Sequence, residues 1–247
     1  MKNKTNKFRS SEKKRLKKVA DWYDPLTRNV EIVTINQRLD VMMPRIKGPK
    51  VLEMGCSTGV MTRRLAKRFP TLTVIDGSEK YIKYVRNLVK AKNVKFILSL
   101  FEDFNTQEKF DDIILANALE HVRNPVLILK KIKSWLKENG RIHIAVPNAR
   151  SLHRRVGQKM GIIKNLDDFS KSDKKAKHRR VYTKEKLRKD IEEAGMRVAL
   201  EQGVFLKPLS QGQINNWDKK ILDALFEISK EFPLDYCSTL YFVCKKK

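Results

Sequence analysis

A chain of 247 residues, 41% of them hydrophobic, is long enough for one large domain with a buried core, which argues against global disorder. No apolar run approaches the length that crosses a bilayer, and the first residues hold no apolar signal segment, so we expect a cytoplasmic protein without a transmembrane segment. Three cysteines (Cys56, Cys237, Cys244) fit a reducing compartment and show no metal-ligand spacing, so no metal site is expected.

The net charge of +26 is concentrated in two segments. Residues 1–20 hold nine basic residues and one acid, and residues 150–190 hold fifteen basic residues and five acids. Such fields attract anionic partners such as RNA, acidic substrates or a membrane surface. Aromatic interleaving does not accompany the basic runs, so a lysine-rich solvated surface is an equal alternative.

The first 44 residues are expected to form an N-terminal basic tail and helical cap. Residues 1–18 are polar and basic, which is typical of a mobile tail leading into a helix. The stretch that follows places Ile32, Ile35, Leu39 and Met42 at a helical period.

From residue 50 onward, strand-like and helix-like segments alternate. Ser78, Asn124 and Thr183 can cap the intervening helices, two of which are expected to stop at Gly140 and Gly195. Strands are predicted at 50–54, 71–76, 94–100, 110–117, 141–148, 196–205 and 238–245. This pattern predicts an α/β fold, a Rossmann-like seven-stranded, mostly parallel sheet with helices on both faces and ligands at the carboxyl ends of the strands.

The stretch VLEMGCSTG, residues 51–59, is expected to bind a ligand. Gly55 and Gly59 let backbone N–H groups approach a ligand directly after the first strand. Asp76 ends the second strand, where an ionised carboxylate can accept both hydroxyls of a ribose. Acidic residues also follow the third strand, in FEDF at 101–104, where they can accept from an adenine amino group.

Two phosphate-binding interpretations of this loop are disfavoured. No Lys-Ser/Thr follows the glycines, so the loop is not a Walker loop. The Gly-x-Gly-x-x-Gly pattern is absent, and Glu53 would face a pyrophosphate with like charge. An acid-x-Gly loop together with a ribose-binding acid suits a cofactor that has a cationic sulfonium and no phosphate.

Residues 45–150 resemble the class I S-adenosylmethionine-dependent methyltransferases, with weaker similarity to the C-terminus. The family's acid-x-Gly-x-Gly-x-Gly motif is here Glu53 to Gly59, with Ser57 in place of the central glycine. Asp76 matches the ribose-binding acid, and Glu102 or Asp103 the adenine-side acid. The resemblance implies the cofactor S-adenosyl-L-methionine, released as S-adenosyl-L-homocysteine, and these cofactor-binding residues: Glu53, Gly55, Cys56, Ser57, Gly59, Asp76, Gly77, Ser78, Glu102, Asp103, Asn117 and Leu119.

The same resemblance implies a domain over residues 45–247, with insertions at about 149–182 and 206–236. Its sixth and seventh strands are expected to form a late reversed pair, with the seventh antiparallel between the fifth and sixth. An amphipathic helix in 213–232, with Trp217, Ile221, Leu225 and Ile228 on one face, would be a lid or packing helix. Trp22 and Tyr23 fit a helix that closes over the methionine end of the cofactor, with hydrophobic anchoring as the competing role.

The segment ANALEHVRNP, residues 116–125, is similar to the one after the fourth strand in small-molecule members, including ubiquinone-pathway O-methyltransferases. The match implies that Asn117, Leu119 and His121 line the pocket. His121 is our candidate general base, with a purely orienting role as the alternative. His143 is expected to be a satisfied core histidine.

The acceptor is expected to be a small molecule methylated at an O or N atom, with an anionic acceptor as one option. His178, Arg179 and Tyr182, next to a helix at the ligand-binding end, are the candidate acceptor-binding residues. RNA methylation on the basic surface is the alternative, although the Asn/Asp-Pro-Pro-aromatic motif used on exocyclic base amines is missing at 116–120. A non-catalytic cofactor-binding scaffold is a third interpretation. The sequence leaves the oligomeric state open.

Overall fold

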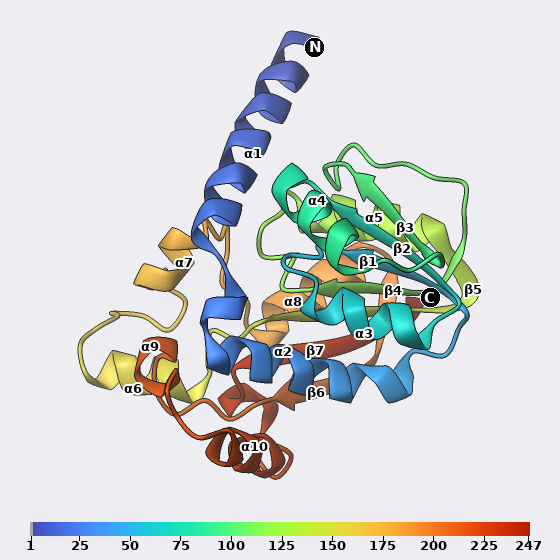
Figure 1. The fold of residues 1–247 in the computed structure, drawn as a ribbon. Helices are drawn as coiled ribbons and strands as arrows, with labels where there is room; N and C mark the ends of the chain where they lie inside the picture. The colour runs from blue at the N-terminus through green and yellow to red at the C-terminus, as the bar shows by residue number, and fades with distance from the viewer. Residues whose placement is uncertain (1) are drawn as a thin grey trace.

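The computed structural model describes residues 2–247, and its centre is a seven-stranded sheet (Figure 1). The strand order is β3-β2-β1-β4-β5-β7-β6, and only β7, between β5 and β6, runs against its neighbours. The strands are β1 (Lys50–Met54), β2 (Thr71–Asp76), β3 (Val94–Leu98), β4 (Phe110–Ala116), β5 (Leu136–Pro147), β6 (Met196–Val204) and β7 (Thr239–Lys246). The predicted fold class and the late reversed pair are confirmed.

Helices cover both faces of this sheet because successive strand residues point to opposite sides. Val51 of β1 belongs to one apolar core and its neighbour Leu52 to the other. One core is shared with α2 (Asn29–Met42), α3 (Val60–Arg68), α4 (Glu79–Leu88) and α10 (Lys219–Ile228), and the other with α5 (Pro125–Trp135) and α8 (Lys184–Glu193). Within residues 2–247, no helix combines the length and the apolar character needed to cross a bilayer.

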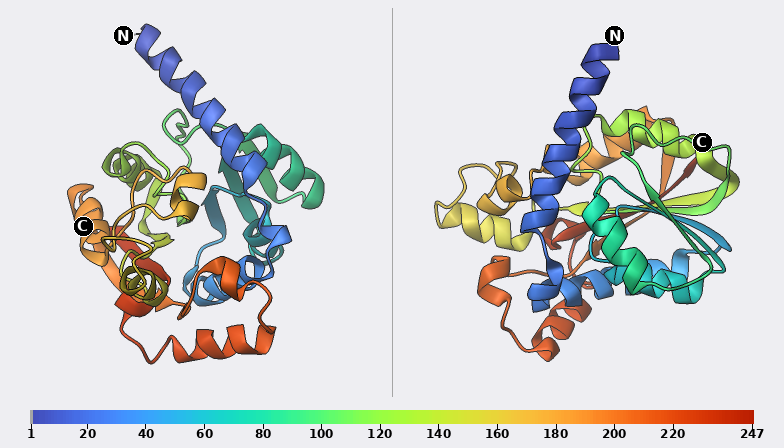
Figure 2. Two further views of the ribbon diagram at one scale, coloured as in Figure 1. Left: turned by 90° about the vertical axis from the view of Figure 1, so that its left-hand side faces the viewer. Right: turned by 45° about the horizontal axis from the view of Figure 1, so that its top comes forward.

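The N-terminal segment differs from the expected mobile tail: α1 is one helix over Lys2–Trp22. Its first turns project beyond the domain, and its later turns lie along one edge of the sheet (Figures 1 and 2). Arg9 pairs with Asp103 at 2.9 Å, and the Lys80 ammonium donates to the carbonyl oxygen of Ala20 at 2.9 Å. The expectation of a tail was wrong because these contacts join residues far apart in the sequence.

The helix boundaries near Gly140 and in residues 213–232 also differ from expectation. Helix α5 ends at Trp135, and β5 begins at once, next to a register irregularity opposite Phe110 and Asp112. The single amphipathic helix expected in 213–232 is instead two helices, α9 (Gln211–Ile214) and α10. In α10, Leu222 is buried while Ile221 and Ile228 are exposed. The remaining short elements are α6 (Leu152–Lys159), α7 (Lys171–Lys175), η1 (Pro25–Thr27), η2 (Met43–Arg45) and η3 (Leu234–Tyr236).

His143 has the core role that the sequence predicted. Its side chain is fully buried, with Nδ1 2.8 Å from the Tyr241 hydroxyl and Nε2 2.9 Å from Asp112 Oδ1. Asp112 also accepts hydrogen bonds from the backbone N–H groups of Lys47 and Gly48. Burial alone would raise the pKa of Asp112, but these hydrogen bonds hold it below its ordinary value.

Replacing Asp112 with alanine should therefore lower the free energy of unfolding by about 3 kcal/mol near neutral pH, because His143 and two backbone donors lose a buried partner. Since the folded-state pKa is depressed, the loss should shrink as the pH falls below about 4, where the unfolded-state carboxyl takes up its proton. Urea denaturation at several pH values measures both effects. Asp21→Ala, which removes an exposed partner of Lys80, is the matched control. A difference between the two variants that does not depend on pH would contradict this role.

Candidate active site

A cavity of about 370 Å³ opens at the carboxyl ends of the parallel strands. The turns after β1, β2 and β4 form its floor, and α1, α2 and the segment around α6 and α7 form its walls. The residues after β3 contribute Leu100 to Glu102. This is the edge at which a doubly wound sheet binds ligands, as the sequence indicated.

Asp76, at the end of β2, ties two of these turns together. Its Oδ2 accepts hydrogen bonds from the backbone N–H groups of Cys56 at 3.0 Å and Ser57 at 3.4 Å. Its Oδ1 accepts one from the N–H of Ser78 at 2.8 Å. The carboxylate thus fixes the loop after β1 against the turn that starts α4, and its side chain faces the cavity.

Residues with positive φ gather at this cavity. Among the described residues, the non-glycine residues with positive φ are Ser57, Asn117, Lys177 and Phe205. Three of them line the cavity, and Lys177 lies between the lining residues Ala176 and His178. Ser57, at φ 48°, adopts a left-handed conformation at a cost of about 1–3 kcal/mol. Backbone strain of this kind marks functional sites.

Two glycines of the predicted site serve packing. At Gly59 the backbone has φ 78°, and an added Cβ would lie 2.9 Å from Val85 of α4. At Gly77 an added Cβ would lie 2.5 Å from the Leu16 side chain of α1, which would have to move to make room. Gly77 lines the cavity, whereas Gly59 lies behind the loop.

Glu53, on β1 beneath the loop, is almost fully buried, and this burial raises the pKa of its carboxyl group to about 8. The carboxyl is therefore protonated at neutral pH. A cation placed beside it would favour the carboxylate and release the proton.

Buried oxygen atoms around the loop lack partners within the protein. In the part of the chain that the structure describes, Glu53 Oε2, Ser57 Oγ and Asn117 Oδ1 form no hydrogen bond. All three residues line the cavity. Since unpaired buried polar atoms are costly, these acceptors fit a ligand that brings donors or positive charge to the floor of the cavity.

The two acids after β3 have different surroundings. Glu102 lines the cavity, whereas Asp103 is turned outward and pairs with Arg9 of α1. Trp22 and Tyr23, at the end of α1, also line the cavity. Burial and the charge of Glu31 raise the pKa of the Tyr23 hydroxyl well above its ordinary value.

Five predicted residues do not line the cavity: Gly59 and Asp103, described above, and Leu119, Arg179 and Tyr182. Leu119 is fully buried in the apolar core against α5 and α8. Tyr182 is buried, and its hydroxyl donates to Asp190 at 2.9 Å. Arg179 pairs with Glu12 of α1 and donates from Nε to the carbonyl oxygen of His121 at 3.1 Å. The side chains of Leu119, Tyr182 and Arg179 point toward the core or toward α1.

The remaining predicted residues do line it. They are Trp22, Tyr23, Glu53, Gly55, Cys56, Ser57, Asp76, Gly77, Ser78, Glu102, Asn117, His121 and His178. Sequence reasoning missed Glu31, Arg38, Glu120, His153 and Lys207, which line the same cavity. Only Glu120 carried a signal, as the neighbour of His121 in ALEHV.

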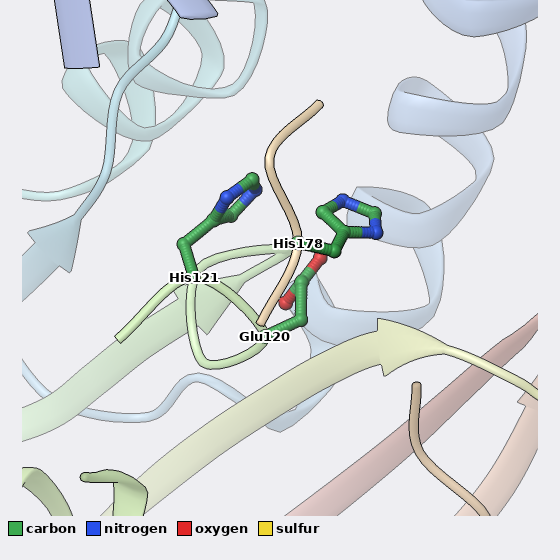
Figure 3. Close-up of side chains that lie close together, drawn as sticks. All are labelled: Glu120, His121 and His178. Atoms are coloured by element: carbon green, nitrogen blue, oxygen red, sulfur yellow. The ribbon is translucent and has the colours of Figure 1, made fainter. Parts of the chain in front are cut away.

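Glu120, His121 and His178 form a close cluster (Figure 3). One possible ligand atom from each lies within 4.8 Å of the others, and the two imidazole rings meet edge-on with centroids 4.7 Å apart. Both carboxylate oxygens of the buried Glu120 lack hydrogen-bond partners among the described residues. Two imidazoles and a carboxylate can move a proton or hold a divalent cation, although the sequence gave no metal pattern.

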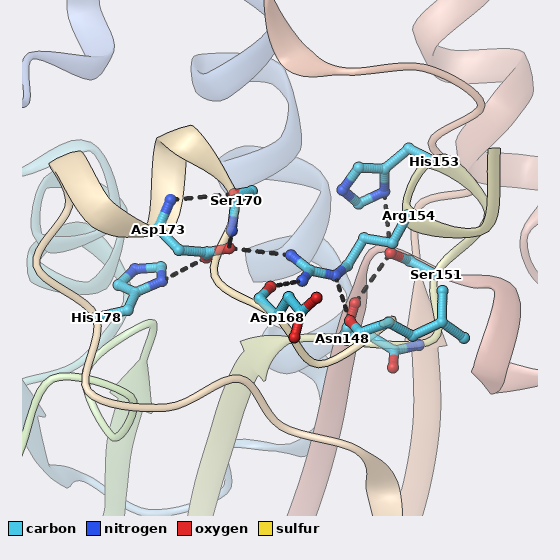
Figure 4. Close-up of polar contacts among 9 residues, drawn as sticks. Asn148, Ser151, His153, Arg154, Asp168, Ser170, Asp173 and His178 are labelled. Atoms are coloured by element: carbon cyan, nitrogen blue, oxygen red, sulfur yellow. Dashed lines mark hydrogen bonds and ion pairs between the residues drawn. The ribbon is translucent and has the colours of Figure 1, made fainter. Parts of the chain in front are cut away.

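The segment around α6 and α7 fixes the orientation of His178 (Figure 4). His178 Nδ1 lies 2.8 Å from Asp173 Oδ1, and Arg154 donates to Asp173 Oδ2 at 3.0 Å. Burial would raise the pKa of Asp173, but hydrogen bonds from His178 and Ser170 hold it well below its ordinary value, so the carboxylate stays ionised.

His121 is poised as a neutral imidazole. Burial first, and then the positive charges of His178 and Arg15, lower its pKa well below 6.5. Its carbonyl oxygen accepts from Arg15 at 3.3 Å and from Arg179 at 3.1 Å, which fixes the turn that carries it. A neutral imidazole can accept a proton at physiological pH.

Comparison with known proteins identifies the family of this chain. The family model of the methyltransferase domain matches residues 16–201. (S)-coclaurine N-methyltransferase of Papaver somniferum is 29% identical over 137 residues, which are 52% of this chain and 39% of that protein. Ubiquinone biosynthesis O-methyltransferase of Xylella fastidiosa (strain 9a5c) is 29% identical over 136 residues, 52% of this chain and 55% of that protein. The chain thus matches only about half, or less, of the length of these relatives.

Solved structures show the same fold. An S-adenosylmethionine-dependent methyltransferase from Mesorhizobium loti aligns with a TM-score of 0.61 and 15% identity over 84% of this chain and 95% of that one. N-methyltransferase NodS from Bradyrhizobium japonicum WM9, in complex with S-adenosyl-l-homocysteine, aligns with a TM-score of 0.58 and 16% identity over 89% of this chain and 88% of that one. Because the family model covers well over half of the chain, the protein belongs to the class I S-adenosylmethionine-dependent methyltransferases.

Proposed function

We propose that the chain transfers a methyl group from S-adenosylmethionine to an O or N atom of a small-molecule acceptor. The observation that carries this proposal is the shared cavity. Asp76 and Glu53 face one part of it, and the neutral imidazole of His121 faces another. The cofactor, when bound, supplies an electrophilic methyl group, and the chain must align the acceptor with it and remove a proton.

On the cofactor side, we assign the ribose to Asp76 and the adenine to Glu102. Asp76 uses three of its roughly four acceptor positions on backbone N–H groups, and the remaining capacity suits one ribose hydroxyl. Glu102 is the acid after β3 that faces the cavity. Glu53 and Asn117 lie on the floor, where their unpaired oxygens can face the positively charged methionine portion.

On the acceptor side, we assign the general base to His121. Glu120 and His178 flank its ring, and Asp173 orients His178. This arrangement can take the proton of a hydroxyl or an ammonium group as the methyl group is transferred. As an alternative role, the same cluster would hold a divalent cation that positions the acceptor.

A small-molecule acceptor is favoured over RNA by the use of the basic side chains. Arg180 donates to the carbonyl oxygens of Leu119 and Val122, and Arg154 and Arg179 pair with acids. Much of the arginine charge in the segment 150–180 therefore fixes loops around the cavity. The similar proteins include (S)-coclaurine N-methyltransferase and ubiquinone biosynthesis O-methyltransferase, whose names indicate small-molecule acceptors.

Glu102→Ala should weaken binding of S-adenosylmethionine about 10- to 100-fold, because a charge-assisted hydrogen bond to the adenine is lost. Asp103→Ala is the matched control, since it removes a carboxylate that faces away from the cavity, and its affinity should stay within about threefold of the wild type. Isothermal titration calorimetry compares the two variants. Equal losses in both would remove Glu102 from the adenine site.

His121→Ala should lower kcat by about 10²- to 10⁴-fold with cofactor affinity largely kept. Because the imidazole pKa is depressed, the wild-type rate should stay constant as the pH falls to about 6.5 and drop only at lower pH. Rate profiles against pH, recorded with and without a chelator, test this assignment. If His121→Ala kept the wild-type rate at every pH, His121 would not be the general base. Loss of activity with chelator that a divalent cation restores would assign the cluster to metal binding.

Tritium from the methyl group of the cofactor should enter the small-molecule fraction of a cell extract, and nuclease treatment should not reduce this label. The cavity volume of about 370 Å³ is the physical reason, since it admits a small acceptor. Scintillation counting of the small-molecule and RNA fractions measures the distribution. Label confined to RNA, with binding that falls steeply as salt rises, would favour the RNA alternative.

A further inference from the structure

The two most exposed large apolar side chains among the described residues lie together at the end of α6. Met160 is 61% exposed and Ile162 is 67% exposed, and Phe169, further along the same loop, is 40% exposed. We call residues 159–169 the tip, and they lie at the outer edge of the molecule, away from the sheet (Figures 1 and 2). Single exposed apolar residues are common, but a group of them on one loop marks an interaction site.

The tip is an ordered turn that is fixed by its own backbone. The N–H of Ile162 donates to the carbonyl oxygen of Gly157 at 2.9 Å, and Gly161 takes φ 72°. Arg154 of α6 donates from Nε to the carbonyl oxygen of Leu166 at 2.8 Å, which ties the far side of the turn to the helix. A Cβ added at Gly161 would meet no atom within 4 Å, so no described residue covers this part of the tip. The backbone contacts therefore hold apolar side chains in solvent.

Six lysines in the tip and in the α7 segment that follows it lack acidic partners. All six are exposed, and none forms an ion pair with a described residue: Lys159, Lys164, Lys171, Lys174, Lys175 and Lys177. The acids of this segment are engaged elsewhere, since Asp167 pairs with Lys186 at 2.9 Å and Asp173 pairs with Arg154 at 3.0 Å. The segment therefore presents unbalanced positive charge together with apolar surface.

The exposed apolar side chains on α10 have a different setting. Ile221 is 48% exposed, but Lys219 pairs with Asp223 and Lys230 pairs with Glu227, so much of the local charge is balanced. Apolar exposure and unbalanced charge thus coincide at the tip and not on α10.

We propose that the tip docks on the surface of a membrane that contains anionic phospholipids. Exposed lysines are attracted to the lipid phosphate groups, and the apolar side chains between them can enter the boundary of the acyl chains. RNA would attract the lysines equally well, but Met160 and Ile162 offer bases no aromatic stacking surface. This docking goes beyond the proposed methyl transfer. His153 and Arg154 of α6 line the cavity, so a docked membrane lies close to the active site.

Co-sedimentation with sucrose-loaded vesicles tests the partner. The full chain is mixed, at physiological ionic strength, with vesicles of phosphatidylcholine alone or of equal parts phosphatidylcholine and phosphatidylglycerol. We expect at least about tenfold tighter binding to the vesicles with phosphatidylglycerol, because each lysine near the anionic surface raises the affinity about fivefold. Equal binding to both kinds of vesicle, or binding to neither, would overturn the proposal.

Variants separate insertion of the tip from charge attraction. The double variant Met160→Ser with Ile162→Ser should bind the anionic vesicles about tenfold more weakly, since two apolar side chains no longer enter the lipid. Ile221→Ser is the matched control, because it removes an exposed isoleucine on α10, and its affinity should stay within about twofold of the wild type. Equal affinities of the two variants would overturn insertion of the tip.

A fluorescent label reports the insertion directly. Ile162→Cys and Ile221→Cys are each labelled with a nitrobenzoxadiazole group, whose emission rises in an apolar environment, and the three native cysteines are buried. With anionic vesicles, the emission should rise for the label at position 162 and stay unchanged for the label at position 221. Unchanged emission at both positions would overturn insertion.

The last outcome concerns RNA as the partner. Suppose that the chain binds a mixed-sequence RNA more tightly than the anionic vesicles, and that binding depends on Lys174 and Lys175 but not on Ile162. The membrane would then be overturned and the surface assigned to RNA. Vesicle binding requires no methyl transfer, so failure of the proposed function and failure of this proposal are distinguishable.

Discussion

The hydrogen bonds from backbone N–H groups to the Asp76 carboxylate are the constraint on which the rest of the site depends. They join the loop after β1 to the turn that begins α4. Burial raises the pKa of Asp76, and the three backbone donors oppose that shift, so the same contacts favour both the loop geometry and the ionised carboxylate. Ser57 can hold a positive φ because this anchor compensates its strain.

Much of the sheet and of the cofactor loops was predictable because those signals are local. Apolar strand patterns, capping residues and the acid-x-Gly loop each depend on residues that are close together in the sequence. Glu53, Gly55 and Asp76 accordingly lie at the cavity as expected. The boundary errors have local causes too: α5 stops at Trp135 because the chain turns directly into β5 beside an irregular pairing with β4.

Side-chain direction was not predictable, since it is set by contacts between distant segments. Tyr182 and Leu119 turn into the apolar core, although their neighbours His178, Glu120 and His121 face the cavity. Arg38 and Lys207 come from segments about 170 positions apart and line the same cavity because α2 packs beside β6. No spacing in the sequence indicates this arrangement.

The basic composition also has a different meaning in three dimensions. Arg15, Arg154 and Arg179 are used to fix α1 and the segment around α6 and α7 against the turn after β4, so a charge run that suggested an external partner partly builds the wall of the cavity.

A crystal structure of the chain with S-adenosylhomocysteine tests the central claim most directly. We expect a ribose hydroxyl within hydrogen-bond distance of the Asp76 carboxylate and the sulfur facing the side of His121. A nucleoside bound elsewhere, with Asp76 contacting only the backbone, would contradict it.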